Sequence, residues 1–119
     1  MKVFVYYNLH KKLWSIKAME GPSKGRVIKH AMTVNLRDAK PKVSQAGRRR
    51  VLKEGRKNVH AGIVGELMGT FNAKVNDLLG EPVTYNPYKY DTFVYAKDTE
   101  QKYTGSDYVW LMDKKVYSI

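Results

Sequence analysis

Apolar and polar residues alternate near the N-terminus in the way that β-strands require. Residues 3–7 are β-forming side chains on both faces, and the alternation resumes over residues 13–18, with Trp14 and Ile16 on one face. The polar residues 8–12 between these runs are typical of a turn. The pattern therefore predicts a β-hairpin.

The same reasoning predicts two more strands and then a break. The Gly-Pro-Ser-Lys-Gly sequence at 21–25 indicates a turn. Residues 26–30 follow as a third strand, and residues 33–37 alternate as a fourth. Pro41 is expected to end this part of the sheet, because proline has no N–H to donate to a strand ladder.

A short helix is expected next. Ser44 suits the N-cap position and Gly55 suits the position just past the last turn, which predicts a helix over residues 45–54. Gly47 inside this segment costs on the order of 1 kcal/mol in a helix interior. An ordered loop is therefore the alternative.

The following segment combines a strand pattern with a helical one. Residues 59–67 are an apolar run whose small residues, Gly62 and Gly65 among them, let another backbone come close. Apolar residues then recur with helical spacing from Phe71 to Leu79, which predicts a two-turn amphipathic helix. A loop is the alternative here as well.

Three more strands are expected before the C-terminus, at the tyrosine-rich residues 89–96 and at residues 108–112 and 116–119. The chain as a whole then has about seven or eight short strands and one or two short helices. This predicts a β-rich α+β fold, a small antiparallel barrel or sandwich. With 119 residues, the chain is expected to form a single domain over residues 1–119.

Charge is distributed unevenly along the chain, whose formal net charge is +11. Residues 1–60 contain 16 Lys and Arg against 3 acids, whereas residues 61–119 contain 6 Lys against 8 acids. All six arginines lie in the first half, and the planar guanidinium group suits phosphate. The asymmetry predicts a basic surface directed at a polyanion. A solvated basic surface without a dedicated partner is the alternative.

The densest basic segment coincides with the predicted helix and continues just past it. Arg49, Lys53 and then Arg56 or Lys57 follow spacings of three or four residues, which form a stripe on a helix. Such cations bind phosphates by releasing counterions, without reading base sequence. The candidate nucleic-acid-binding residues are Arg48, Arg49, Arg50, Lys53, Arg56 and Lys57.

Tyrosines suggest a second kind of contact with nucleic acid. On a strand, Tyr88 and Tyr90 share one face, and exposed rings at that spacing stack on unpaired bases. Half-buried packing in the strand is the alternative for both side chains.

Catalytic chemistry has one candidate residue, His60. The chain has no cysteine, and the histidines at 10, 30 and 60 lack ligand-like spacing, so neither a metal nor a cofactor is expected. If the protein is an enzyme, His60 would serve as acid or base in metal-independent RNA cleavage, with Glu54 or Glu66 nearby. On one strand, His60 and Glu66 would stand about 20 Å apart, so a direct pair would need a bulge or another strand. A hydrogen-bonded structural histidine is the alternative.

Three segments resemble small basic proteins of tailed bacteriophages and prophages: KVFVYYNLHKKLWSIKAMEGPSKGRVIKH, AGRRRVLKEGRKNVHAGIVG and YNPYKYDTF. The resemblance carries over no activity and no functional residue. It implies the cytoplasm of an infected bacterium, where small phage proteins commonly bind nucleic acid or interfere with host machinery. A cytoplasmic location without a membrane partner also fits the absence of any stretch that could span a bilayer.

Taken together, the residues favour a non-catalytic protein that binds nucleic acid, DNA or RNA, through the phosphate backbone. The leading alternative is an inhibitor whose basic face docks on an acidic surface of a host protein. A small metal-independent ribonuclease that uses His60 is the third.

Overall fold

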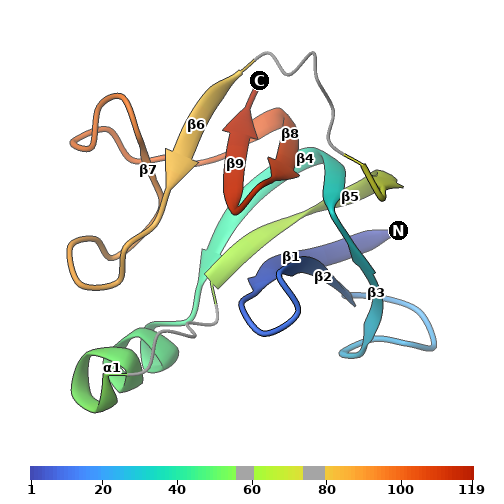
Figure 1. Cartoon of the computed structure of the whole chain (residues 1–119), viewed down its shortest axis with the longest axis horizontal. Coiled ribbons are helices and arrows are strands. Elements are labelled where there is room, and N and C mark those ends of the chain that lie inside the picture. Colours follow the sequence, from blue (N-terminus) through green and yellow to red (C-terminus); the bar gives the residue numbers. More distant parts are fainter. Residues whose placement is uncertain (56–60, 74–79) are drawn as a thin grey trace.

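The computed structural model describes residues 1–55, 61–73 and 80–119. They form nine strands in one antiparallel sheet and one helix (Figure 1). The strand order is β3-β2-β1-β5-β4-β8-β9-β6-β7, and the sheet is not closed into a barrel. The elements are β1 (Lys2–Asn8), β2 (Leu13–Ala18), β3 (Val27–Ala31), β4 (Thr33–Val43), α1 (Gln45–Glu54), β5 (Ala61–Phe71), β6 (Glu81–Thr84), β7 (Val94–Tyr95), β8 (Ser106–Met112) and β9 (Lys115–Ser118).

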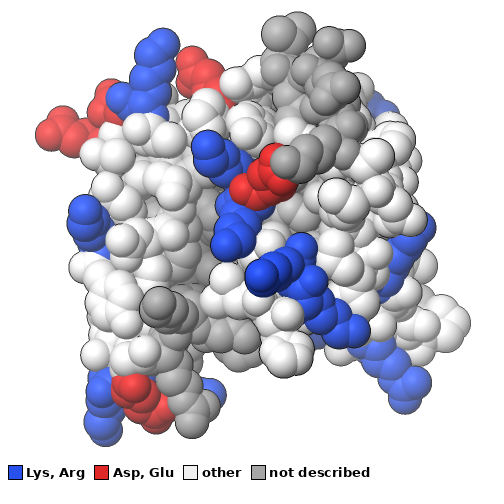
Figure 2. All heavy atoms as spheres, in the orientation of Figure 1, with Lys and Arg blue, Asp and Glu red and all other residues white. Residues whose placement is uncertain are grey.

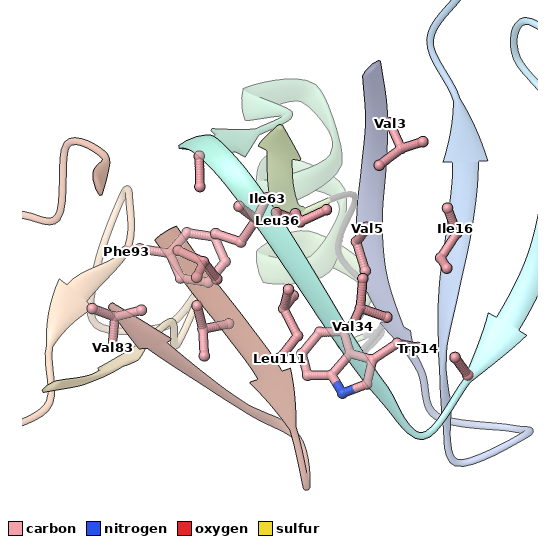
Figure 3. Packing of buried hydrophobic residues seen from close by; sticks show 14 of the residues in the cluster. Val3, Val5, Trp14, Ile16, Val34, Leu36, Ile63, Val83, Phe93 and Leu111 are labelled. Atoms are coloured by element: carbon pink, nitrogen blue, oxygen red, sulfur yellow. The ribbon is translucent and has the colours of Figure 1, made fainter. Parts of the chain in front are cut away.

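The sheet bends so that its two halves bury their apolar faces against each other, as in a sandwich. β4 lies between the halves, paired with β5 on one side and β8 on the other. Its register shifts between Arg37 and Lys40, where Asp38 has a φ of 50°, and such bulges bend a strand. In Figure 3, Val5 and Trp14 from one half face Leu111 and Phe93 from the other across this core. The predicted β-rich α+β sandwich is confirmed.

The alternation near the N-terminus is confirmed as a hairpin. β1 pairs with β2 in antiparallel register, with Val5 opposite Ile16. Val3, Val5, Trp14 and Ile16 are all buried, so the face expected to point inward does so. Asn8 closes the turn between the strands, because its side-chain oxygen accepts hydrogen bonds from two backbone N–H groups that follow it, both at 3.0 Å.

The expectation that Pro41 ends the sheet segment is wrong. β4 continues to Val43, and Pro41 pairs with Ile63 of β5. The pairing of β4 with β8 ends at Ala39, so Pro41 lies where β4 has a neighbouring strand on one side only. A residue without an N–H is tolerated at such an edge position.

β5 confirms the expected close approach of backbones and corrects the helix predicted after it. A Cβ atom at Gly62 would collide with the carbonyl oxygen of Val5 in β1, and one at Gly65 would lie 2.9 Å from the carbonyl oxygen of Arg37 in β4. The strand extends to Phe71, which therefore lies in the sheet rather than in a helix. Most of the predicted helix lies outside the described residues.

The tyrosine-rich strand predicted over residues 89–96 is wrong, because a turn begins before it. The side-chain oxygen of Asn86 accepts a hydrogen bond from the N–H of Tyr88 (3.0 Å), and the Asn86 carbonyl accepts from Lys89 (3.0 Å) and Tyr90 (2.9 Å). These local bonds hold the chain in a turn, and only Val94–Tyr95 pairs as β7. β6, which contains Pro82, is a strand that the sequence pattern did not predict.

Candidate nucleic-acid interface

The basic segment forms the helix α1, with the two caps that the sequence predicts. The Ser44 side chain accepts a hydrogen bond from the N–H of Gly47 at 3.1 Å. Gly55 ends the helix in the left-handed conformation (φ 68°), and its N–H donates to the Val51 carbonyl at 2.8 Å. The predicted helix is therefore confirmed over the ordered loop, and Gly47 is buried in its first turn.

Two side chains attach α1 to the segment between β6 and β7. Arg48 Nε donates to the carbonyl oxygen of Tyr90 at 2.9 Å, and Gln45 Nε2 donates to that of Asp91 at 3.1 Å. Val51, also on the inner side of the helix, is 1% exposed. Figure 1 shows α1 at one end of the sheet, beside the ends of β4 and β5. The inner side of the helix is thus attached to the rest of the protein, and its outer side is not involved in these contacts.

The outer side of α1 presents three of the candidate cations to solvent. Arg49, Arg50 and Lys53 are exposed, whereas Arg48 is half-buried and occupied by its bond to Tyr90. Arg48 therefore helps to hold α1 in position, in addition to contributing positive charge. Arg56 and Lys57 lie outside the described residues.

The ribonuclease hypothesis depends on a residue that the structure does not describe. That residue is His60, which lies outside the described part of the chain. Glu66, one of its candidate partners, forms an ion pair with the N-terminal ammonium group at 3.2 Å. Within the described ranges, no three acidic or histidine side chains gather as metal ligands would, and no helix there is long and apolar enough to cross a membrane.

Tyr88 and Tyr90 do not share a strand face, because Tyr88 lies within the turn that begins at Asn86 and Tyr90 comes directly after it, outside any strand. Tyr88 is 56% exposed at the tip of this turn. Tyr90 is half-buried, and its carbonyl oxygen is held by Arg48. Of the two side chains, that of Tyr88 is the more exposed.

Sequence reasoning missed an aromatic cavity beside α1. Its walls include Tyr7, Trp14, Tyr85 and Phe93, and Lys114 lies at its edge. Burial raises the pKa of Tyr85 above its ordinary value, while the nearby charge of Arg48 acts in the opposite direction. Tyr7 and Trp14 lie opposite each other in the predicted β1–β2 hairpin, but Tyr85 and Phe93 come from a segment distant in sequence, so no local pattern could have joined the two pairs.

Basic side chains are not confined to α1. Figure 2 shows Lys and Arg side chains across the middle of one face, over the β1–β2 and β8–β9 turns, and others around its rim. Lys114 of the β8–β9 turn has its Nζ 5.8 Å from the centre of the Tyr7 ring in β1. Positive charge therefore lies both on α1 and, through Lys114, at the cavity.

Comparison with known proteins identifies the family. The family described as Mycobacterium phage L5 gene 82 protein matches residues 1–119. The gene 82 protein of Mycobacterium phage L5 is 47% identical over 122 residues, which cover 98% of this chain and 94% of that protein. No solved structure matches the chain. The resemblance to phage proteins is thereby confirmed, and the chain belongs to the family of the Mycobacterium phage L5 gene 82 protein.

Proposed function

We propose that the protein binds nucleic acid, DNA or RNA, through the phosphate backbone, with α1 as the main contact. The observation that carries this proposal is the division of the helix into two sides. One side is fixed by the hydrogen bonds of Gln45 and Arg48, and the other presents Arg49, Arg50 and Lys53 to solvent.

A helix held in this way lowers the entropic cost of binding a charged backbone. The three exposed cations project from a fixed segment, so phosphates meet them without ordering a loop. Their contribution to affinity comes mainly from the release of counterions and carries no base specificity. The formal net charge of +11 adds long-range attraction to any polyanion. The proposed setting is the cytoplasm of an infected bacterium.

Two triple variants test the role of the helix. One replaces Arg49, Arg50 and Lys53 by alanine. The matched control replaces Lys24, Arg26 and Lys29, which are also exposed but lie at the β2–β3 turn and in β3. Both variants lose the same formal charge, so a general loss of attraction affects them equally.

Fluorescence anisotropy with a labelled 20-nucleotide strand at low salt measures the difference. We expect the α1 variant to bind about tenfold or more weakly than wild type, because it loses direct phosphate contacts, and the control to change much less. Circular dichroism confirms that each variant is folded. Equal losses in the two variants, or no binding of wild type at low salt, would contradict the proposal. The second result would favour an acidic protein as the partner.

A further inference from the structure

The aromatic cavity lies between the two halves of the sandwich, and both halves supply its walls. Tyr7 and Trp14 come from the β1–β2 hairpin, whereas Tyr85 and Phe93 come from the segment that joins β6 to β7. The cavity is open to solvent and has a volume of about 210 Å³. This is below the roughly 300–1,000 Å³ of pockets that hold drug-sized ligands, so it suits a single small ring system.

The rings of the walls form two pairs. Tyr7 and Trp14 meet edge to face with centroids 5.2 Å apart, and Tyr85 and Phe93 lie 5.2 Å apart with a tilt of 33°. Aromatic walls of this kind bind a flat ring by stacking and apolar contact. A planar heterocycle is therefore a better match for the cavity than an aliphatic chain.

One polar atom in these walls, the indole Nε1 of Trp14, is buried and lacks a hydrogen-bond partner among the described residues. The Tyr85 hydroxyl, in contrast, has the Arg48 side chain as a neighbour. A buried donor that stays unpaired is costly, so such groups call for a specific explanation. A nucleobase carries acceptors on its edges, which a hydrocarbon ring lacks, and can supply the partner of this indole N–H.

One cation lies at the cavity and another beside one of its walls. Lys114 is exposed at its edge, with its Nζ 5.8 Å from the Tyr7 ring centre. On the other side, Arg48 joins α1 to the segment that carries Tyr85 and Phe93. Asp91, an acid on that segment, is paired with Lys102 at 3.8 Å. The charge around the cavity thus complements a polyanion.

We propose that this cavity takes one unpaired base of a bound nucleic-acid strand, with the adjoining phosphates on Lys114 and on α1. The assignment rests on the proposed binding of nucleic acid by α1, and it narrows the ligand to single-stranded nucleic acid. Bases in a duplex are stacked and paired, and removing one from the stack costs free energy. The cavity therefore favours a strand whose bases are already free.

Affinity measurements with matched variants test this assignment. The probes are a labelled dT20 strand and a labelled DNA hairpin of similar length. Tyr85→Ala is compared with Tyr88→Ala, since Tyr88 is exposed in the neighbouring turn and does not line the cavity. Lys114→Ala is compared with Lys115→Ala, its exposed neighbour. We expect dT20 to bind more tightly than the hairpin, and the two cavity variants to lose about 5- to 100-fold for dT20, the range that stacking of one base supports.

Tryptophan fluorescence gives a readout in which the reporter variant keeps every wall of the cavity. The chain has two tryptophans, so Trp110→Phe leaves Trp14 as the single reporter. We expect dT20 to quench this signal by stacking, and to leave the Trp110 signal of the Trp14→Phe variant nearly unchanged. Lack of Trp14 quenching, equal affinity for strand and hairpin, or cavity variants no weaker than their controls would each overturn the assignment. If the α1 triple variant still weakens binding, only the cavity is refuted; if no probe binds at all, the proposed function itself fails.

Discussion

Burial gives individual side chains of this fold properties that their sequence positions do not reveal. Tyr103 is the largest fully buried side chain, and its hydroxyl lies 2.8 Å from Ser106 Oγ. Burial raises the pKa of Tyr103 above its ordinary value of 10.0, outweighing the hydrogen bond with Ser106, which acts in the opposite direction. The folded state therefore holds the phenolic proton more tightly than the unfolded chain does.

This raised pKa predicts a loss of stability at alkaline pH. The contribution is fully present below pH 10.0, the ordinary value, and is lost as the pH rises through the higher folded value. We expect Tyr103→Phe to be less stable than wild type near pH 8 by about 1 kcal/mol, because it loses a hydrogen bond. The gap should narrow above pH 10. Urea unfolding at several pH values measures it, with Tyr88→Phe as an exposed control. A gap that stays constant with pH would contradict this explanation.

At the scale of elements, local signals predicted some structures and non-local packing decided others. α1 was predictable because its start and end depend on Ser44 and Gly55, two residues that act on their own neighbours. β1 and β2 were predictable from alternation alone. The segment around Tyr88 was not, because the hydrogen bonds of Asn86 override the β-propensity of the tyrosines.

The two strands that pair with β5 restrict which residues fit in its sequence. β5 pairs with β1 on one side and β4 on the other, and Gly62 faces the backbone of β1 so closely that no Cβ fits. We expect Gly62→Ala to lower the free energy of unfolding by roughly 1–3 kcal/mol, the usual cost of overpacking. The glycine in this case is required by space and not by a positive φ.

Gly69 provides a control in the same strand. A Cβ there would meet the Phe71 ring at 3.5 Å, an ordinary contact, so Gly69→Ala should be close to neutral. Chemical denaturation of both variants measures the difference. Similar unfolding midpoints for the two would mean that β1 and β5 can move apart at little cost, against the packing described here.

At the scale of the whole molecule, sheet topology mixes the basic and acidic halves of the chain. β4, from the basic half, lies between β5 and β8, which both come from the other half. The sequence indicated the basic helix, which lies on one continuous segment. It could not indicate the cavity, because the Tyr7–Trp14 pair of the β1–β2 hairpin meets Phe93 and Lys114 only through pairings between strands that are distant in sequence. One part of the candidate site, α1, is therefore encoded by a local segment, whereas the cavity is formed only by the tertiary fold.

The number of phosphates that the proposed interface contacts can be counted from the salt dependence of binding. The three exposed cations of α1 and Lys114 give about four contacts. For a single strand, this predicts that the logarithm of the association constant falls with the logarithm of the salt concentration with a slope of about −3. Replacing Arg49, Arg50 and Lys53 by alanine should bring the slope to about −1, whereas replacing Lys24, Arg26 and Lys29 should leave it nearly unchanged. Anisotropy titrations of dT20 between low and physiological salt measure all three slopes. If both triple variants flatten the slope equally, the phosphates respond to the net charge of the molecule and not to α1.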